Sequence, residues 1–180
     1  MKKIIMICMV LLAMSSCKKE PNNVPLSEED AAAIPYQLGQ TVKFLNQDND
    51  TVVFQVTWDQ THLSDYYTTT DHNYGSQTLD AGSPGVFCFT RTVELTCETY
   101  PSFISFTIYP EKVMYFNWNN ELVISCDLPS SDESASINGV NYEHVHHNQY
   151  TGEMLYDWYY NEEFGLLYFE KGDFSLTRVP

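Results

Sequence analysis

The sequence predicts an all-β domain, a single antiparallel meander of about nine or ten strands that forms a barrel or a sandwich. Three observations point to this fold class. Beyond residue 34, no segment of about ten or more residues places apolar side chains at helical spacing. Turn-forming residues recur about every 8–12 residues. Aromatic residues, which favour strands, make up 14% of the chain.

The first 16 residues are predicted to be a signal peptide. They begin with the basic tripeptide MKK and continue with an apolar stretch over residues 4–14, about eleven residues long. Such a stretch suits the apolar region of a secretory signal and is too short to span a bilayer. Two small serines then precede Cys17, in the sequence MSSC of residues 14–17.

The MSSC sequence resembles the lipobox of bacterial lipoproteins, with Met14 at the position that is usually Leu. The resemblance implies that the thiol of Cys17 is acylated, that the chain is cleaved just before it, and that the new amino group also receives a fatty chain such as palmitate. Two or more acyl chains hold a protein stably on a bilayer. We therefore expect the lipid bilayer to be a partner through Cys17. A plain signal peptide with an incidental cysteine is the alternative.

The charge of the chain limits its partners. It carries 24 acidic and 9 basic residues, a formal net charge of −15. Loss of Lys2 and Lys3 with the signal peptide makes the mature chain still more negative. Because so acidic a surface is repelled by nucleic acid and by anionic lipid, the composition excludes nucleic acid as a partner.

The mature chain divides into a tether and a domain. Residues 17–34 contain the lipidated cysteine and then KKEPNNVPLSEEDAAAI, which is rich in proline, asparagine and acids. This composition predicts a flexible tether, with one helical turn in SEEDAAA. Residues 35–180 follow as the all-β domain, which is long enough for one hydrophobic core.

Strands and turns can be placed along the domain from composition. The predicted strands are residues 41–46, 51–58, 85–98, 103–109, 112–118, 121–126, 140–150, 153–160, 164–170 and 173–179. Short turns are predicted at residues 46–50, Pro110-Glu111, Asn119-Asn120, Asn138-Gly139, Thr151-Gly152 and Lys171-Gly172. The Asn-Gly pair is the strongest of these hairpin signals.

The strand over residues 112–118 is apolar on both faces. Met114, Phe116 and Trp118 share one face, while Val113 and Tyr115 share the other. Such a strand is normally covered on both sides. This favours a barrel with an outer cover, a sandwich with an added helix or loop, or a cavity filled by a ligand, and segments 59–84 and 127–137 are the candidate covers. A two-residue turn at Asn119-Asn120 would pair Trp118 with Glu121, Phe116 with Val123 and Tyr115 with Ile124.

The histidine-rich run EHVHH, residues 143–147, is a candidate metal site. His144 and His146 share a face of the predicted strand, and a turn at Thr151-Gly152 would place Asp157 opposite His146 and Tyr159 opposite His144. Two histidines and a carboxylate could hold zinc with a water or a fourth ligand, for which His62 and His72 are distant candidates. The alternative is a polar hairpin face in which His146 is hydrogen-bonded to Asp157.

No other motif predicts catalysis or a cofactor. The chain lacks a G-x-S-x-G elbow, a glycine-rich phosphate loop and an H-E-x-x-H pair. The acidic run NQDNDT, residues 46–51, lacks the glycine and glutamate spacing of an EF-hand loop. The sequence therefore predicts no catalytic residues, no cofactor and no enzyme activity.

Three cysteines remain in the mature chain once Cys17 is assigned to the anchor. Cys88, Cys97 and Cys126 allow at most one disulfide within the chain, and no C-x-x-C pair is present. Burial as small apolar side chains is favoured, and the pairing among the three stays open.

The aromatic set in residues 156–160 has two interpretations. Alternation puts Tyr156, Trp158 and Tyr160 on one face of the strand and Tyr159 on the other face with Asp157. An exposed set could bind sugar rings or a protein partner, whereas a buried set belongs to the core. The core interpretation is favoured.

The C-terminal segments INGVNYEHVHHNQY and EMLYDWYYNEEFGLLYFEKGDFSLTRV resemble the ends of small, functionally unassigned lipoproteins of Bacteroidota. The shared pattern is Tyr142 and Val145, then Tyr159-Tyr160, Gly165 and residues 166–169. The resemblance implies an outer-membrane address and an antiparallel fold, with lipocalin-like and LolA/LolB-like half-barrels as possible layouts. Members displayed on the cell surface have acids soon after the lipidated cysteine, whereas Lys18 and Lys19 follow it here.

Together these features predict an outer-membrane-anchored envelope lipoprotein whose non-catalytic β-domain has a structural or interaction role. One alternative is a carrier or sensor that binds a small apolar or sugar ligand in a β-barrel cavity. Another is a zinc-binding envelope protein that uses His144, His146 and Asp157. An aromatic-lined cavity would favour the carrier, and a filled interior would count against it. The sequence names no particular protein or small-molecule partner.

Overall fold

The computed structural model describes residues 23–65, 87–99, 103–119, 121–128, 131–150 and 155–180. Cys17 and the predicted signal peptide lie outside these residues, as does the predicted turn Thr151-Gly152. Within the described part of the chain, no helix has the length and apolarity needed to cross a membrane.

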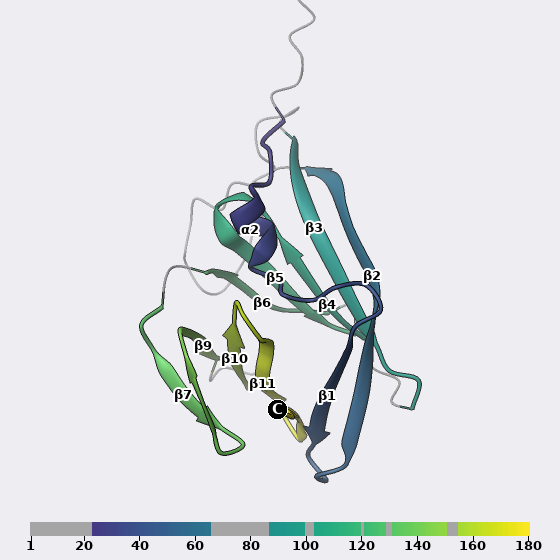
Figure 1. Cartoon of the computed structure of the whole chain (residues 1–180), viewed down its shortest axis with the longest axis vertical. Helices are drawn as coiled ribbons and strands as arrows, with labels where there is room; N and C mark the ends of the chain where they lie inside the picture. The colour runs from purple at the N-terminus through teal and green to yellow at the C-terminus, as the bar shows by residue number, and fades with distance from the viewer. Residues whose placement is uncertain (1–22, 66–86, 100–102, 120, 129–130, 151–154) are drawn as a thin grey trace, which may run out of the picture.

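One antiparallel sheet of ten strands makes up most of the domain (Figure 1). Its strands are β1 (Thr41–Asn46), β2 (Thr51–Asp65), β3 (Phe87–Thr96), β4 (Phe103–Ile108), β5 (Val113–Trp118), β6 (Glu121–Asp127), β9 (Val145–Tyr150), β10 (Tyr156–Asn161), β11 (Gly165–Lys171) and β12 (Phe174–Arg178). Their spatial order is β6-β5-β4-β3-β2-β1-β12-β11-β10-β9. A separate hairpin contains β7 (Ser134–Ile137) and β8 (Val140–Glu143), and the short helical elements are α2 (Glu28–Ala32) and the 3-10 turn η1 (Pro110–Lys112).

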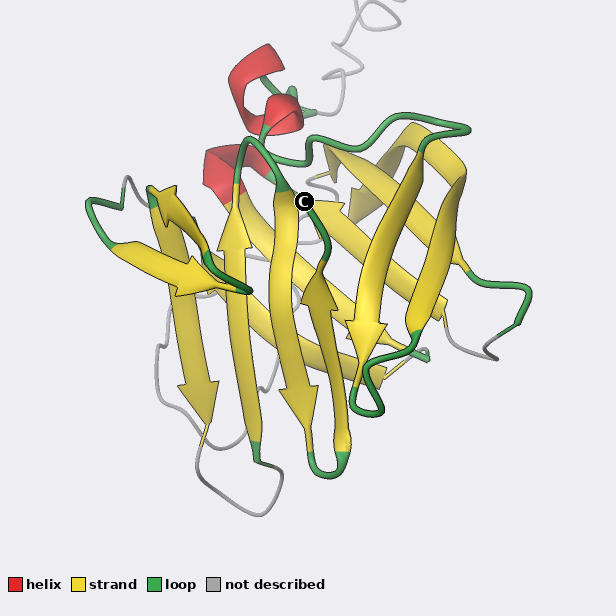
Figure 2. Ribbon diagram, turned by 60° about the horizontal axis from the view of Figure 1, so that its bottom comes forward, coloured by secondary structure: helices red, strands yellow, loops and turns green. Residues whose placement is uncertain are grey.

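The sheet curls on itself into a half-barrel, which confirms the all-β prediction (Figures 1 and 2). Curling brings β5 opposite β11, so that the rings of Phe116 and Phe169 lie 5.0 Å apart. The edge strands β6 and β9 leave the curled sheet open. An ion pair between Lys171 and Glu121, 2.6 Å long, bridges the two halves of the sheet.

Alternation along each strand sends one set of side chains into the interior. On β1, Val42 and Phe44 are buried while Thr41 and Lys43 are exposed. This is the pattern expected of a sheet with one face on a core and the other toward water. The largest fully buried side chains come from both halves of the curled sheet and from the segment after α2, and they include Trp158, Tyr36, Tyr160, Phe44, Phe54, Phe106, Phe116 and Phe169.

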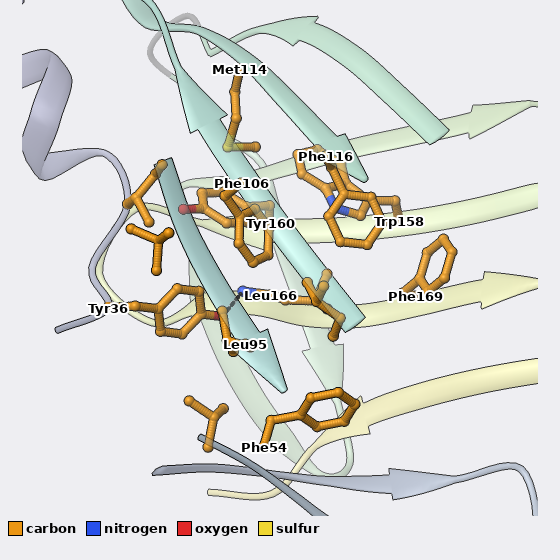
Figure 3. Close-up of a cluster of buried hydrophobic side chains, with 14 of the residues drawn as sticks. Tyr36, Phe54, Leu95, Phe106, Met114, Phe116, Trp158, Tyr160, Leu166 and Phe169 are labelled. Atoms are coloured by element: carbon orange, nitrogen blue, oxygen red, sulfur yellow. Dashed lines mark hydrogen bonds between the residues drawn. The ribbon is translucent and has the colours of Figure 1, made fainter. Parts of the chain in front are cut away.

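Interlocking aromatic rings fill the interior (Figure 3). The ring of Phe106 lies 5.5 Å from Tyr36, 5.3 Å from Phe116 and 5.7 Å from Tyr160. Trp158 stacks on Tyr160 at 5.3 Å with planes 9° apart. Burial of each such side chain contributes about 1.5–3 kcal/mol to the free energy of unfolding. The interior of the half-barrel is therefore a packed core.

The segment that follows α2, residues 33–36, closes one end of the half-barrel; we name it the plug. The helical turn predicted in SEEDAAA is confirmed, and Ser27 caps it by accepting a hydrogen bond from the N–H of Asp30 at 2.9 Å. Immediately afterwards, Ala33, Ile34 and Tyr36 are fully buried in the core. The hydroxyl of Tyr160 donates to the carbonyl of Ala33 at 2.7 Å.

Arg91 fixes this plug to the sheet. Its guanidinium donates to the carbonyls of Ala31, Ile34 and Tyr36 at 2.7, 2.8 and 2.6 Å. The same group forms a bidentate pair with Asp59 at 2.8 and 2.9 Å. A lysine lacks the planar fork that makes these contacts together.

The packed part of the chain begins earlier than the sequence indicated. The N–H of Val24 donates to Phe87 at 2.8 Å, and the N–H of Phe89 donates back to Val24 at 2.9 Å. The prediction of a tether over residues 17–34 is therefore wrong for its later part, because Val24 pairs with the sheet and Ala33 and Ile34 enter the core. The proline- and acid-rich composition of this segment gave no sign that Ala33 and Ile34 enter the core.

The strand over residues 112–118 differs in two ways from the prediction. Trp118 does pair with Glu121, but a bulge shifts the rest of the register, so that Phe116 pairs with Ile124 and Tyr115 with Ser125. The bulge turns Ile124 toward the core beside Phe116. The outer side chains of β5 are only partly buried. The predicted cover over residues 59–84 is wrong for residues 59–65, which continue β2, and residues 66–84 lie outside the described chain. The end of the other predicted cover, 127–137, enters the β7–β8 hairpin, which covers other strands.

Candidate functional site

The β7–β8 hairpin lies across the outer face of the C-terminal strands (Figure 2). Its turn is the predicted Asn138-Gly139 pair, and both residues have positive φ, 51° and 76°. Positive φ at both central positions defines a type I′ turn, which suits the twist of a hairpin. The apolar face of the hairpin packs on the outer face of β9, β10 and β11, and the contact forms a second hydrophobic core. This second core contains Ile137, Tyr142, Val145 and Leu167, with Ala135, Val140, Tyr159 and Tyr168 against it.

A row of ring side chains crosses the outer face beside the hairpin. By register, His147 on β9 pairs with Tyr159 on β10, Tyr159 pairs with Tyr168 on β11, and Tyr168 pairs with Thr177 on β12. The imidazole of His147 stacks on Tyr159 at 4.2 Å with planes 14° apart. The rings of Tyr159 and Tyr168 are 5.9 Å apart at 72°.

An open groove of about 660 Å³ lies between β7 and this row; we name it the outer-face groove. Residues 133–138 form one wall of the groove. The other lining residues are Val145, His147, Asp157, Tyr159, Tyr168 and Thr177. Its volume falls within the range of sites that take small ligands.

Carboxylates hold the polar groups of the groove in place. Asp157 accepts a hydrogen bond from His147 Nε2 at 2.8 Å, and the hydroxyl of Tyr168 donates to Glu170. Burial, and then the negative charge of Asp157, raise the pKa of Tyr159. Burial and the hydrogen bond to Glu170 raise the pKa of Tyr168. Both tyrosines are therefore neutral hydrogen-bonding groups at physiological pH.

The structure does not bring the predicted metal ligands together. The expected pairing of His146 with Asp157 and of His144 with Tyr159 is wrong, since Asp157 pairs with Gln149 and His146 pairs with Tyr160. The connection between β9 and β10 spans residues 151–155, which is longer than the two-residue turn assumed from the sequence. The register between β9 and β10 is therefore shifted by three residues from the predicted one. Because side chains alternate between the two faces, a shift by an odd number of residues moves His146 to the face opposite Asp157.

Each of these side chains has its own partner instead. His146 is 9% exposed and lies 3.4 Å from Glu162, and burial lowers the pKa of its imidazole. His144 lies between β8 and β9 at a φ of 55°, with Nδ1 2.8 Å from the carbonyl of Ser131. Within the described ranges, no group of three or more His, Cys, Asp or Glu side chains is placed to hold a metal ion. His72 lies outside those ranges, and His62 Nε2 is 3.4 Å from Thr90 Oγ1.

The cysteines show no link to the groove. Cys88 is fully buried on β3, and Cys97 is partly buried just beyond the end of the same strand. Nine residue steps of extended chain separate the two, a span of about 30 Å, so they cannot pair with each other within one chain. The side chain of Cys126 lies outside the described set, and its backbone is part of β6.

The aromatic set of β10 divides as alternation predicts. Trp158 and Tyr160 are buried in the main core, and Tyr156 packs against it. Tyr159 is on the opposite face, where it forms part of the outer-face groove. Sequence reasoning missed His147 and Tyr168 as site residues, because their places depend on strand pairing. The sign in the sequence was the run GLLYF, in which apolar and aromatic residues occupy both faces of one strand.

The chemistry of the groove suits binding. The pair of His147 and Asp157 resembles two members of a hydrolytic triad. A complete triad also has a nucleophilic hydroxyl or thiol that is hydrogen-bonded to the imidazole. Among the described residues, the hydrogen-bond partner of His147 is Asp157 alone. Flat rings flanked by fixed carboxylates and by a strand edge are features of recognition surfaces.

The comparisons with known proteins add no assignment. The chain has no match among protein-family models, none among curated proteins and none among solved structures. The half-barrel and the outer-face groove are therefore the basis for a functional proposal.

Proposed function

We propose that this protein is a membrane-anchored envelope lipoprotein whose β-domain is a non-catalytic interaction module that binds its partner in the outer-face groove. In this proposal, acylated Cys17 holds the chain on the outer membrane. The half-barrel serves as a rigid scaffold for the groove and contributes no interior ligand site. The bacterial lipobox pattern of residues 14–17 supports the anchor.

The position of the open groove is the observation that carries the proposal. A carrier of the lipocalin kind needs an interior cavity, and here the interior positions are taken by rings that contact one another. The groove lies outside the core, between a hairpin and a row of rings. Rings and strand edges that remain open on a rigid scaffold are typical of partner-binding surfaces.

The anchor and the groove are compatible in space. Seven residue steps separate Cys17 from Val24, which pairs with the start of β3, and an extended chain of that length reaches about 25 Å. The domain would therefore stay close to the bilayer. The β7–β8 hairpin lies at the other side of the domain from the point where the N-terminal chain leaves it (Figure 1). A partner in the envelope can reach the groove in that arrangement.

Site-specific photo-crosslinking of the full-length protein in its own cells tests the proposal. A photoreactive phenylalanine replaces Tyr168, which lines the groove, or Leu38, which is 66% exposed elsewhere. We expect a discrete adduct from position 168 and none of the same size from position 38. Equal adducts at both positions, or none at position 168, would contradict a groove-directed partner.

A second candidate, sugar binding, is favoured by the row of rings. Tyr159 and Tyr168 present two aromatic rings beside Asp157 and Glu170, and rings with adjacent carboxylates suit the faces and hydroxyls of sugars. An oligosaccharide that quenches tyrosine fluorescence in the wild type but not in Tyr168→Ala would support it. Absence of any such quenching would remove it.

A further inference from the structure

The outer edge of β7 has backbone groups that the hairpin does not use. A two-residue turn makes Ile137 and Val140 a hydrogen-bonded pair, and such pairs alternate along an antiparallel ladder. Ala135 and Tyr142 are the next hydrogen-bonded pair. The N–H and C=O groups of Ser134 and Ser136 therefore point away from β8. Among the described strands, β7 pairs with β8 alone.

This edge borders the outer-face groove. Every residue of β7 lines the groove, together with Glu133 before it and Asn138 after it. Both faces of a strand can line one groove only where its edge is turned toward that groove. A chain placed about 4.8 Å from β7 would lie over the row of rings formed by His147, Tyr159 and Tyr168.

Apart from its short length, β7 has no feature that blocks pairing at its edge. Natural sheets block such pairing with charged side chains, proline, bulges or very short edge strands. The four residues SASI contain no charge and no proline, and the register of β7 with β8 has no bulge. An edge that is open, uncharged and beside a groove is suited to accept another strand.

The charge of the groove selects the side chains of that strand. Glu133 and Asp157 line it, Glu170 is hydrogen-bonded to Tyr168 of the floor, and no lysine or arginine is among the lining residues. Arginine side chains stack on tyrosine rings and pair with carboxylates in a planar fork. A strand with basic residues at every second position would direct them all to the floor.

We propose that the outer-face groove binds an extended, cationic polypeptide segment, which adds to the edge of β7 as a third strand and places alternate basic side chains over Tyr159 and Tyr168. This inference rests on the proposed function of the groove as the partner site. Ser134 and Ser136 supply the backbone hydrogen bonds, and Asp157 and Glu170 supply the opposite charge.

Ser136→Pro tests the strand addition in the mature full-length protein, purified in detergent. Proline removes the N–H of residue 136, which the hairpin does not use, and edge positions of this kind accept proline. The probe is the peptide acetyl-(Thr-Arg)4-amide, and binding is measured by calorimetry. We expect Ser136→Pro to weaken binding about tenfold, the value of one backbone hydrogen bond, while Ser136→Ala stays within about twofold.

Two further measurements keep the test independent of folding. Amide hydrogen exchange should show protection of Ser134 and Ser136 when the probe binds the wild type. Asp157→Asn should weaken binding of the probe at low salt by about threefold, and acetyl-(Thr-Glu)4-amide should not bind. Equal binding of the acidic peptide, unchanged affinity in Ser136→Pro, or unprotected Ser134 and Ser136 would each overturn strand addition.

The remaining outcomes separate this inference from the proposed function. Suppose that chitohexaose binds the wild type but not Tyr168→Ala, and that the arginine peptide does not bind. The groove is then still a binding site, and the inference of strand addition is wrong. If the protein forms a dimer that Ser136→Pro abolishes, the strand comes from a second copy and the cationic partner falls. If the peptide fails to bind and the crosslink at position 168 is also absent, both proposals fall.

Discussion

The hydroxyl of Tyr36 accepts a hydrogen bond from the backbone N–H of Leu166 at 2.7 Å, although the two residues are 130 positions apart. Both are buried, and burial raises the pKa of Tyr36 to about 12. The bond links the segment after α2 to the start of β11, as Figure 3 shows. Together with the hydrogen bonds of Arg91 and Tyr160, this buried bond holds the plug in the end of the half-barrel.

We predict that Tyr36→Phe destabilises the protein. The change leaves the N–H of Leu166 buried without its acceptor, at a cost of about 1–3 kcal/mol. Urea denaturation followed by tryptophan fluorescence measures the free energy of unfolding. Tyr115→Phe is the control, since this side chain is only half-buried on the outer face. Loss of its hydroxyl should lower the free energy of unfolding by less than about 0.5 kcal/mol. Equal stability of Tyr36→Phe and the wild type would contradict the role of the bond.

A second prediction concerns Gly165, which must have no side chain. Its φ is 82°, and a Cβ there would lie 2.2 Å from the Tyr36 hydroxyl oxygen. Gly165→Ala should therefore cost about 2–4 kcal/mol, from backbone strain and the steric clash together. Gly172→Ala separates the two causes, because Gly172 has a φ of 63° and nothing within 4 Å of its Cβ position. A thermal melt in which the two variants lose the same stability would show that the contact with Tyr36 is unimportant.

The third prediction is a pH dependence at His146. Burial lowers the pKa of this histidine below its unfolded value, against the opposing pull of Glu162 at 3.4 Å. The folded state therefore binds a proton less readily than the unfolded state, so the contribution of His146 to stability is present above about pH 6.5 and is lost as the pH falls through the folded pKa.

The control for this pH effect is His146→Gln, which cannot titrate. The stability of the wild type relative to this variant should fall between about pH 7.5 and pH 5.5. Lys112 and Glu133 also face His146, and both remain in the variant. A difference that stays constant over this range would contradict neutral burial of His146.

The fourth prediction concerns the anchor. Cys17→Ser removes the thiol that is acylated in the proposed anchor, so we expect the protein to leave the membrane fraction after cell disruption and centrifugation. Acyl chains, and not the acidic domain, supply the membrane affinity in this account. Ser16→Ala keeps the cysteine and a small neighbour, and it should stay in the membrane fraction. Continued membrane association of Cys17→Ser would contradict the lipobox interpretation.

The sequence predicted the parts of the fold that depend on local pattern. Alternation on β5 and β10 and the Asn138-Gly139 turn are read from neighbouring residues, and the structure confirms them. The plug was not predicted because the hydrogen bond that Tyr36 makes in the core is to Leu166, which lies far along the chain. The site was missed for a similar reason. His147 and Tyr168 contact Tyr159 only because of the register of β9, β10 and β11. The register of β9 with β10 depends on the length of the connection between them, which is longer than the two-residue turn predicted from composition.

Native mass spectrometry of the mature protein, isolated from its own envelope in mild detergent, tests the central claim most directly. We predict a chain that begins at an acylated Cys17 and carries a partner bound in the outer-face groove, and that this partner is absent from Tyr168→Ala and retained in Leu38→Ala. A small apolar ligand that stays bound in Tyr168→Ala would place the binding site in the interior and contradict the account.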